Sequence, residues 1–274
     1  MQTLTEIRTI LSDWGITPKH KLGQNFLVDH NLITKLVDAS GVRAGDVVLE
    51  VGPGTGTMTE ELLDRGCEVV ACELDADMSD ILRERLGERE NFALVEGDCL
   101  ATKHEISREI MEKLGGRGFT LVANLPYGAA TPLILVLLTD VPTCTGQYVT
   151  IQREVADRLM AKPGSKMYGV ISVVAQLFAQ VELVAKLPKE CFWPQPEIAS
   201  SMISIVPRVS VDDADIDRKL FAAFCQKLFN QRRKQLGSVL KGDGVLPEGF
   251  DGRVRAETLE PSGFLDLYRW YAAR

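Results

Sequence analysis

A strand, a glycine-rich loop and a helix follow one another between residues 46 and 65, and this succession constrains the fold more than any other feature. Asp46–Val51 reads DVVLEV, a short apolar run bounded by turn residues, which predicts a buried strand. The loop Gly52-Pro53-Gly54-Thr55-Gly56 follows at once, and the pattern of Thr57–Arg65 predicts a helix. Because a strand that runs through glycines into a helix is a common unit of α/β sheets, the chain is expected to belong to the α/β class.

Strands and helices keep alternating as far as residue 206. Further strands are expected at Glu68–Glu73, Phe92–Glu96, Phe119–Ala123, Tyr148–Gln152, Val181–Leu187 and Ser201–Val206. Further helices are expected at residues 3–13, at residues 29–40 with Asp29 as the cap, between Glu73 and Leu86, and at Leu133–Leu138, Glu154–Met160 and Tyr168–Gln180. This alternation predicts a Rossmann-like parallel sheet with helices on both faces.

The pattern changes near residue 209, after which helices alone are expected. They are predicted at Arg218–Leu228, Gln231–Leu240, Ala256–Thr258 and Ser262–Tyr271. The segment Val209–Asp217 is rich in Asp and is interpreted as a linker. We therefore expect a large α/β domain at residues 1–208 and a small helical domain at residues 209–274.

Composition favours an ordinary globular protein, with 45% hydrophobic and 25% charged residues in 274. No apolar run reaches the roughly 18 residues that a membrane span needs, and the acidic N-terminal stretch does not resemble a secretory signal, so a cytoplasmic protein is expected. Six cysteines form no CxxC pair, and three histidines are scattered. The cysteines are therefore interpreted as reduced core thiols, and no metal site is expected.

The net charge of −7, taken alone, argues against a nucleic-acid partner. The charge is uneven, however, since residues 208–274 hold 12 Lys and Arg against 10 Asp and Glu, while the preceding segment carries a net charge of −9. Basic residues cluster at Lys19-His20-Lys21, at Lys162 with Lys166, and at Arg232-Arg233-Lys234. Each cluster could be an ordinary solvated face, but a nucleic-acid surface on this chain would have to be built from them.

Acidic residues stand at the ends of three successive predicted strands: Glu50, Glu73 and Asp98. Ligands of such sheets bind at the carboxyl ends of the strands, where glycines allow close approach of the backbone. A carboxylate after the second strand can take the hydroxyls of a ribose, and one after the third can accept from an adenine amine. The loop spacing is GxGxG and not the dinucleotide pattern GxGxxG, and a pyrophosphate would face Glu50. The set favours an adenosine with a cationic side chain, such as S-adenosylmethionine, although the loop alone could be a tight turn and each acid alone a cap.

The tetrapeptide Asn124-Leu125-Pro126-Tyr127 follows the fourth predicted strand. An adenine or cytosine amine is a poor nucleophile because its lone pair is delocalised into the ring. The Asn124 side-chain carbonyl and the Leu125 backbone carbonyl could accept both N–H groups and favour a pyramidal nitrogen. Pro126 fixes the turn, and Tyr127 offers a ring for base stacking, which is worth about 1–3 kcal/mol per base. A plain turn with a core tyrosine is the alternative.

These residues resemble the family of ribosomal RNA small-subunit adenine N6,N6-dimethyltransferases. The tetrapeptide and the glycine loop are similar to the amine and cofactor motifs of that family. Further similar stretches, in family order, are Lys21–Leu27 (KLGQNFL), Gln152–Leu159 (QREVADRL), Phe192–Ser200 (FWPQPEIAS) and Asn230–Leu236 (NQRRKQL), the last resembling a basic helix. The resemblance runs from residue 21 to about residue 236 and implies a class I methyltransferase sheet with a small C-terminal helical domain.

The resemblance also implies roles for individual residues. Those expected to bind S-adenosylmethionine are Gln24, Asn25, Leu27, Glu50, Gly52, Gly54, Thr55, Glu73, Leu74, Asp98 and Asn124. Those expected to hold the target adenine are Asn124, Leu125, Pro126, Tyr127 and Phe192, with the rings of Tyr127 and Phe192 on its two faces. Those expected to bind RNA are Lys19, Lys21, Arg153, Arg232, Arg233 and Lys234.

The implied substrate is a pair of adjacent adenines near the 3′ end of small-subunit ribosomal RNA, in an assembling subunit, each receiving two methyl groups from a monomeric enzyme. The chain departs from the often basic family by its sequence pI of about 5.2, and Trp193 has no assigned role. Three alternatives stay open: a drug-resistance enzyme acting on large-subunit RNA, a DNA adenine methyltransferase, and a non-catalytic assembly factor. The DNA enzymes usually have Asp first or two prolines in the tetrapeptide, whereas Lys21–Leu27 and Arg232–Lys234 look closer to the small-subunit group.

Overall fold

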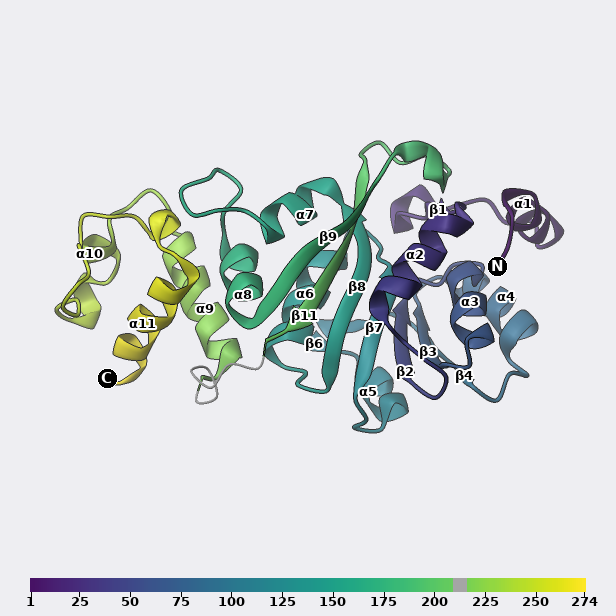
Figure 1. Cartoon of the computed structure of the whole chain (residues 1–274), viewed down its shortest axis with the longest axis horizontal. Helices are drawn as coiled ribbons and strands as arrows, with labels where there is room; N and C mark the ends of the chain where they lie inside the picture. The colour runs from purple at the N-terminus through teal and green to yellow at the C-terminus, as the bar shows by residue number, and fades with distance from the viewer. Residues whose placement is uncertain (209–215) are drawn as a thin grey trace.

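A seven-stranded sheet forms the centre of the molecule in a computed structural model that describes residues 1–208 and 216–274 (Figure 1). Its strand order is β4 (Phe92–Glu96), β3 (Glu68–Glu73), β2 (Val47–Val51), β7 (Phe119–Asn124), β8 (Cys144–Gln152), β11 (Ser200–Pro207) and β9 (Ala179–Leu187). Every strand expected from the sequence is present. The fold class and the glycine loop between a strand and a helix are thereby confirmed.

The prediction of a parallel sheet was wrong for one strand, β11. The pairs β3–β4, β2–β3, β2–β7 and β7–β8 are parallel, but β11 is antiparallel to both β8 and β9. A parallel crossover needs a connection of about a dozen residues or more that is usually a helix. The connection from β9 to β11, residues 188–199, holds the short turn η2 (Lys189–Cys191) and the two-residue strand β10 (Phe192–Trp193) but no crossover helix, and the chain returns in the opposite direction.

Helices cover both faces of the sheet, as predicted, and side chains from successive strand positions feed two cores. On one face, α2 (His30–Ser40), α3 (Thr57–Asp64) and α4 (Ala76–Leu86) pack on a cluster that includes Val48 and Val122. On the other face, a larger cluster includes Leu49 and Leu121 and takes in α5 (Arg108–Leu114), α6 (Ala130–Thr139), α7 (Arg153–Leu159) and α8 (Val170–Phe178). The predicted cap of α2 is confirmed, because the Asp29 side chain accepts from the backbone N–H of Leu32.

Two small strand pairs were not expected from the sequence. β1 (Phe26–Leu27) pairs with β10, and β5 (Leu100–Thr102) pairs with β6 (Glu105–Ile106). The first pair joins two segments that are more than 160 residues apart, and the second forms a hairpin ahead of α5. Ahead of the sheet, α1 (Leu4–Asp13) begins with a capping box between Thr3 and Glu6.

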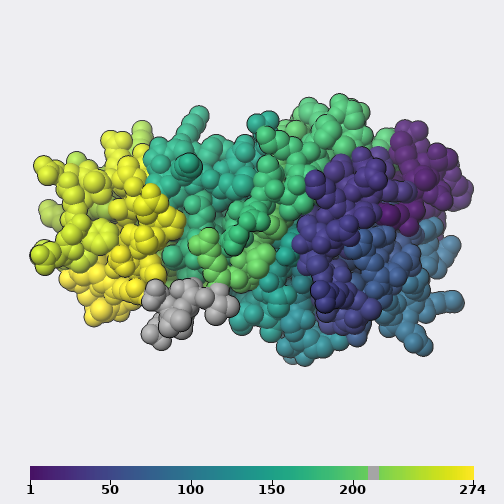
Figure 2. Space-filling model, in the orientation of Figure 1, coloured from purple at the N-terminus to yellow at the C-terminus, as the bar shows by residue number. Residues whose placement is uncertain are grey.

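The C-terminal region is helical, with α9 (Arg218–Phe229), α10 (Leu236–Val239), two 3-10 turns (Lys241–Asp243 and Ala256–Thr258) and α11 (Pro261–Ala272). These helices form the end of the molecule opposite α1, as Figures 1 and 2 show. Phe221, Phe224 and Phe264 belong to the same buried cluster as α6 and α8. The two-domain division therefore stays a prediction, and most of the predicted linker, residues 209–215, lies outside the described residues.

The expected helix at Gln231–Leu240 was wrong in its first half. Residues 231–234 form a turn, and only Leu236–Val239 are helical, so the stretch that resembles a basic helix is not one here. Tertiary partners replace helical ones: the Leu236 and Gly237 N–H groups donate to the carbonyls of Val254 and Gly252 at 2.8 Å each. The local pattern was helical, but long-range contacts set the conformation.

All six cysteines are free, and five of them are buried, which agrees with their interpretation as core thiols. Within residues 1–208 and 216–274, no helix is long and apolar enough to cross a membrane.

Candidate active site

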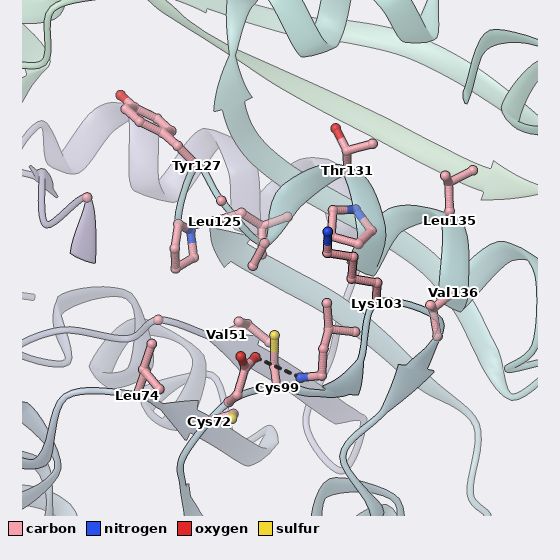
Figure 3. A pocket seen from close by; sticks show the side chains of 18 of the residues that line it. Val51, Cys72, Leu74, Cys99, Lys103, Leu125, Tyr127, Thr131, Leu135 and Val136 are labelled. Atoms are coloured by element: carbon pink, nitrogen blue, oxygen red, sulfur yellow. Dashed lines mark hydrogen bonds between the residues drawn. The ribbon is translucent and has the colours of Figure 1, made fainter. Parts of the chain in front are cut away.

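The carboxyl ends of β2, β3 and β7 meet at one edge of the sheet, and a cavity of about 1610 Å³ lies over them. Ligand pockets of about 300–1,000 Å³ are usual for one small molecule, so this cavity has room for a cofactor and a second group. The glycine loop, the end of β3 and the tetrapeptide all line it (Figure 3). The sequence motifs are therefore brought together in space.

Two glycines of the loop are required by neighbouring side chains and by their backbone angles. Gly52 has φ +72°, and a Cβ there would lie 2.9 Å from the ring of Pro126. Gly54 has φ +60°, and a Cβ there would lie 2.7 Å from the ring of Phe26. Only glycine tolerates both constraints. The loop thus packs directly under the tetrapeptide and β1, which the sequence did not indicate.

Glu73, at the end of β3, is held by backbone donors. Its two carboxylate oxygens accept from the N–H groups of Asp75 and Gly54, at 2.9 and 3.1 Å. Burial raises the pKa of Glu73. Glu73 thus lies beside the loop and lines the cavity, and its ribose-binding role stays a prediction.

Glu50 and Asp98 differ from each other in exposure. Glu50 is 2% exposed and accepts from the Thr59 hydroxyl at 2.7 Å, and burial raises its pKa to about 8. Asp98 is exposed, and its carboxylate accepts from the Leu100 N–H at 2.9 Å. Leu74 lines the same part of the cavity and is 56% exposed, which leaves an apolar side chain facing it.

Thr55 is a buried residue of the glycine loop with a polar side chain. It is 1% exposed and lines the cavity, and its hydroxyl has no hydrogen-bond partner among the described residues. Buried polar atoms are normally paired, so this hydroxyl is available to a ligand. Gln2, a residue outside the sequence motifs, holds the Thr55 carbonyl through its side-chain amide at 2.8 Å.

The tetrapeptide begins at the last residue of β7 and lines the cavity (Figure 3). The Asn124 Nδ2 group donates to the backbone carbonyl of Asn25 at 3.0 Å, which leaves the carbonyl end of that amide to accept from an amine. The Leu125 N–H donates to the Thr150 carbonyl of β8 at 3.0 Å, so the backbone of the motif is fixed to the sheet. The Tyr127 ring lines the cavity, with its hydroxyl 3.5 Å from that of Ser200.

Phe192 is the residue among those predicted to hold the adenine or the cofactor that the structure does not bring to the cavity. It is 3% exposed, belongs to the core under α2, and is absent from the cavity lining. Its neighbour Trp193, which had no assigned role, stacks on Phe26 at 6.3 Å and carries the guanidinium of Arg8 5.1 Å from its ring centre. Trp193 therefore anchors α1 and β1 to β10.

Residues 19–27, which we call the strap, run along the cavity from η1 (His20–Leu22) to β1. Its residues from His20 to Leu27 line the cavity, including the predicted cofactor residues Gln24, Asn25 and Leu27. Lys19, predicted to bind RNA, forms ion pairs with Asp75 and Asp77 at 2.6 Å each.

The other predicted RNA-binding residues are spread over the molecule. Lys21 is exposed at the cavity, and Arg153 is 61% exposed at the start of α7, 3.8 Å from Asp157. Arg233 and Lys234 are exposed in the turn before α10, near the far end of the molecule (Figure 1). Arg232 already has partners within the protein, because its guanidinium donates to Glu257 and to the carbonyls of Ser165 and Lys166.

A second arm of the cavity extends toward the C-terminal helices and had no signal in the sequence. It is lined by the β5–β6 hairpin, by Thr131 and Leu135 of α6, and by one side of α9, including Ala223 and Gln226. Among the described residues, no group of three or more His, Cys, Asp or Glu side chains is placed to hold a metal ion.

Comparison with known proteins places these features in a family. The model of the family described as ribosomal RNA adenine dimethylase matches residues 16–272. A protein of Geobacillus thermodenitrificans named ribosomal RNA small subunit methyltransferase A is 37% identical, over 95% of this chain and 93% of its own length.

Two solved structures are similar in fold. A dimethyladenosine transferase from Plasmodium falciparum has a TM-score of 0.71 and 23% identity, covering 90% of this chain and 98% of that one. The 23S rRNA methyltransferase ErmE has a TM-score of 0.63 and 23% identity, covering 90% of this chain and 100% of that one. With a family model that spans nearly the whole sequence and a relative of matching length, the chain belongs to the ribosomal RNA adenine dimethylase family.

Proposed function

We propose that this protein transfers methyl groups from S-adenosylmethionine to the N6 amines of two adjacent adenines near the 3′ end of small-subunit ribosomal RNA, two to each. One observation carries the proposal. The tetrapeptide that can accept from an amine, the glycine loop and the carboxylate of Glu73 line one cavity, in a chain whose family is named for adenine dimethylation. The name of the Geobacillus relative supports the small subunit as the source of the RNA.

The residues of the cavity fit the cofactor. The unpartnered hydroxyl of Thr55 and the backbone of Gly52 and Gly54 would hold its methionine part, and Gln24, Asn25 and Leu27 of the strap would cover it. Glu73 would take the ribose hydroxyls, while Asp98 and the exposed side chain of Leu74 would hold the adenine ring. Glu50 lies beneath the loop, and a positive charge on a bound cofactor would favour its ionised form over the protonated one. When bound, the cofactor supplies an activated methyl group on a good leaving group.

The protein's own task is to position the amine. The base must leave its stack to reach the cavity. The Asn124 side-chain carbonyl and the Leu125 backbone carbonyl would accept its two N–H groups, while Pro126 fixes the turn and Tyr127 stacks on the ring. A fixed near-attack geometry of this kind can contribute about 7–11 kcal/mol to lowering the barrier. Because Phe192 is in the core here, the second face of the base needs either a movement of β10 or another side chain.

The RNA surface is proposed to include Lys21, Arg153, Arg233 and Lys234, which are exposed. Its separated cationic patches on an acidic chain suit a particle better than naked RNA, because a particle can meet several patches at once. We propose that the protein acts as a monomer on assembling small subunits in the cytoplasm.

The test is to incubate the protein with S-adenosylmethionine and small ribosomal particles that lack methylation near the 3′ end. The RNA is then digested, and N6,N6-dimethyladenosine is sought by mass spectrometry. Particles that are already methylated serve as the control. Dimethyladenosine in the 3′-terminal fragment supports the proposal. Methylation of large-subunit RNA alone would replace the proposed substrate, and cofactor binding without any methylation would favour an assembly factor.

A further inference from the structure

A buried carboxylate outside the motifs, that of Asp75, joins the strap to the end of β3. Its side chain is 2% exposed and caps α4 through the N–H of Asp77. The same carboxylate accepts from Lys19 Nζ at 2.6 Å and from Gln24 Nε2 at 2.7 Å. Both of these donors belong to the strap, although they are more than 50 residues away in the sequence.

A hydrogen bond within the strap supports this contact. The backbone N–H of Lys19 donates to Gln24 Oε1 at 2.7 Å, so the amide of Gln24 bridges Lys19 and Asp75. The hydrogen bond from Lys19 to Asp75 raises the pKa of the lysine, which keeps it charged. An exposed ion pair contributes little to stability, whereas a buried carboxylate that loses its partners lowers the stability of the fold considerably. Because the Asp75 side chain is almost fully buried, its contacts with the strap are structural.

The contact continues into the proposed cofactor site. The backbone N–H of Asp75 donates to Glu73, the proposed ribose carboxylate, and Glu73 accepts in turn from Gly54 of the loop. At its other end, the strap is held by Asn124 of the tetrapeptide through the Asn25 carbonyl. One set of hydrogen bonds therefore spans strap, ribose carboxylate, glycine loop and tetrapeptide.

From this geometry we infer that Asp75, with Lys19, is a positioning pair that latches the strap over the cofactor, and that Lys19 acts in this way and not as an RNA ligand. The inference rests on the proposed function for the identity of the ligand. The latch itself does not depend on a ligand, because both partners of each of its hydrogen bonds are protein atoms.

Hydrogen–deuterium exchange of the full chain without ligand tests the latch directly. Asp75→Asn keeps the cap of α4, since Asn caps as well as Asp, but removes the charge that binds Lys19. Lys19→Met removes the cation alone. Each change is expected to raise exchange over residues 19–27 by about tenfold, with no added effect in the double variant, because the two act as a unit. Lys35→Met, an exposed lysine of α2 outside the cavity lining, is the matched control and should not change exchange of the strap.

Equilibrium dialysis with S-adenosylmethionine gives the functional readout. Both latch variants should raise its Kd by about tenfold, while the KM for ribosomal particles stays as in the wild type. Unchanged exchange in both variants, additive effects in the double variant, or a Lys19→Met change confined to the KM for particles would overturn the inference. If the wild type binds no S-adenosylmethionine, the proposed function fails, but the exchange measurement still decides whether the latch exists.

Discussion

The strand-end site and the C-terminal helices are held together by different forces. At the ends of β2, β3 and β7, the strap and the glycine loop meet through hydrogen bonds to Asp75 and Glu73. In the C-terminal region the contacts are between rings: Phe221 lies edge-on to Phe178 and Tyr268, and Phe229 stacks on Phe264. Directional bonds fix positions to a fraction of an ångström, whereas apolar packing supplies stability without fixing a single polar geometry.

The difference teaches where chemistry and stability reside. Loss of a ring in the C-terminal region should cost stability and spare the cofactor site. Loss of a polar group at the strand ends should cost function with less effect on stability. The second arm of the cavity, between α6 and α9, is where the two regions touch. Substitutions in each region can therefore break or sharpen the comparison.

The largest effect on stability is expected from Phe221→Ala. The Phe221 side chain is fully buried, with ring centres 5.4 Å from Phe178 and 5.5 Å from Tyr268. Removal of a buried phenylalanine ring costs about 3–5 kcal/mol, so the free energy of unfolding in urea should fall by that amount. The Kd for S-adenosylmethionine of the folded protein should not change. A weaker cofactor affinity would show that the helices also order the strand-end site.

Asn124→Ala should have the largest effect on chemistry. The variant loses the side-chain acceptor for the target amine, and misplacement of a reacting group costs on the order of 100-fold in rate. Its single-turnover rate with under-methylated particles should fall by that factor, while dialysis still detects bound S-adenosylmethionine. Asn31→Ala, an exposed asparagine on α2, is the control. Normal turnover of the Asn124 variant would remove this residue from the proposed site.

Glu50→Gln should change how stability depends on pH. Burial raises the pKa of Glu50 from its usual 4.5 to about 8. Between these values, the folded protein keeps a proton that the unfolded chain has released, so the stability of the wild type falls as pH rises through this window. Each pKa unit corresponds to about 1.4 kcal/mol, and about 3 units separate pH 5 from the folded pKa, so we expect a loss on the order of 4 kcal/mol relative to Glu50→Gln between pH 5 and pH 9. The free energy of unfolding of both proteins is measured in urea at each pH. The same pH dependence in the two proteins would contradict this prediction.

The sequence was most informative where function depends on short local motifs. The glycine loop and the tetrapeptide could be recognised because strand ends of a parallel sheet meet at one edge, so residues after successive strands converge. The places of Glu73 and Asp98 beside the cavity could be predicted in the same way, while their roles stay predictions. The reason for Gly52 and Gly54 could not be predicted, because it lies in the rings of Pro126 and Phe26, which the fold brings over the loop.

Where the structure differs from what the sequence led us to expect, the shared physical cause is contact between distant segments. Phe192 is in a core that α2 completes, and Lys19 pairs with an acid 56 residues away. The connection before β11 holds no crossover helix, and the turn at residues 231–234 is held by Arg232, which reaches another loop. The sequence does carry a signal for Asp75, which stands at the cap of a predicted helix two residues after Glu73. Nothing local indicates that it binds the strap.

The smallest effect, and the sharpest comparison, is expected from the neighbouring arginines 232 and 233. The Arg232 guanidinium donates to the Ser165 and Lys166 carbonyls at 2.9 and 3.0 Å and pairs with Glu257, so it joins the α7–α8 loop to the C-terminal region. Arg233 is exposed. Arg232→Ala should lower the free energy of unfolding by about 1 kcal/mol through lost hydrogen bonds. Arg233→Ala should leave stability unchanged but weaken binding to ribosomal particles and reduce the salt dependence of that binding by about one phosphate contact. If both variants lose only particle binding, Arg232 binds RNA despite its contacts, and the polar link between the α7–α8 loop and the C-terminal region is dispensable.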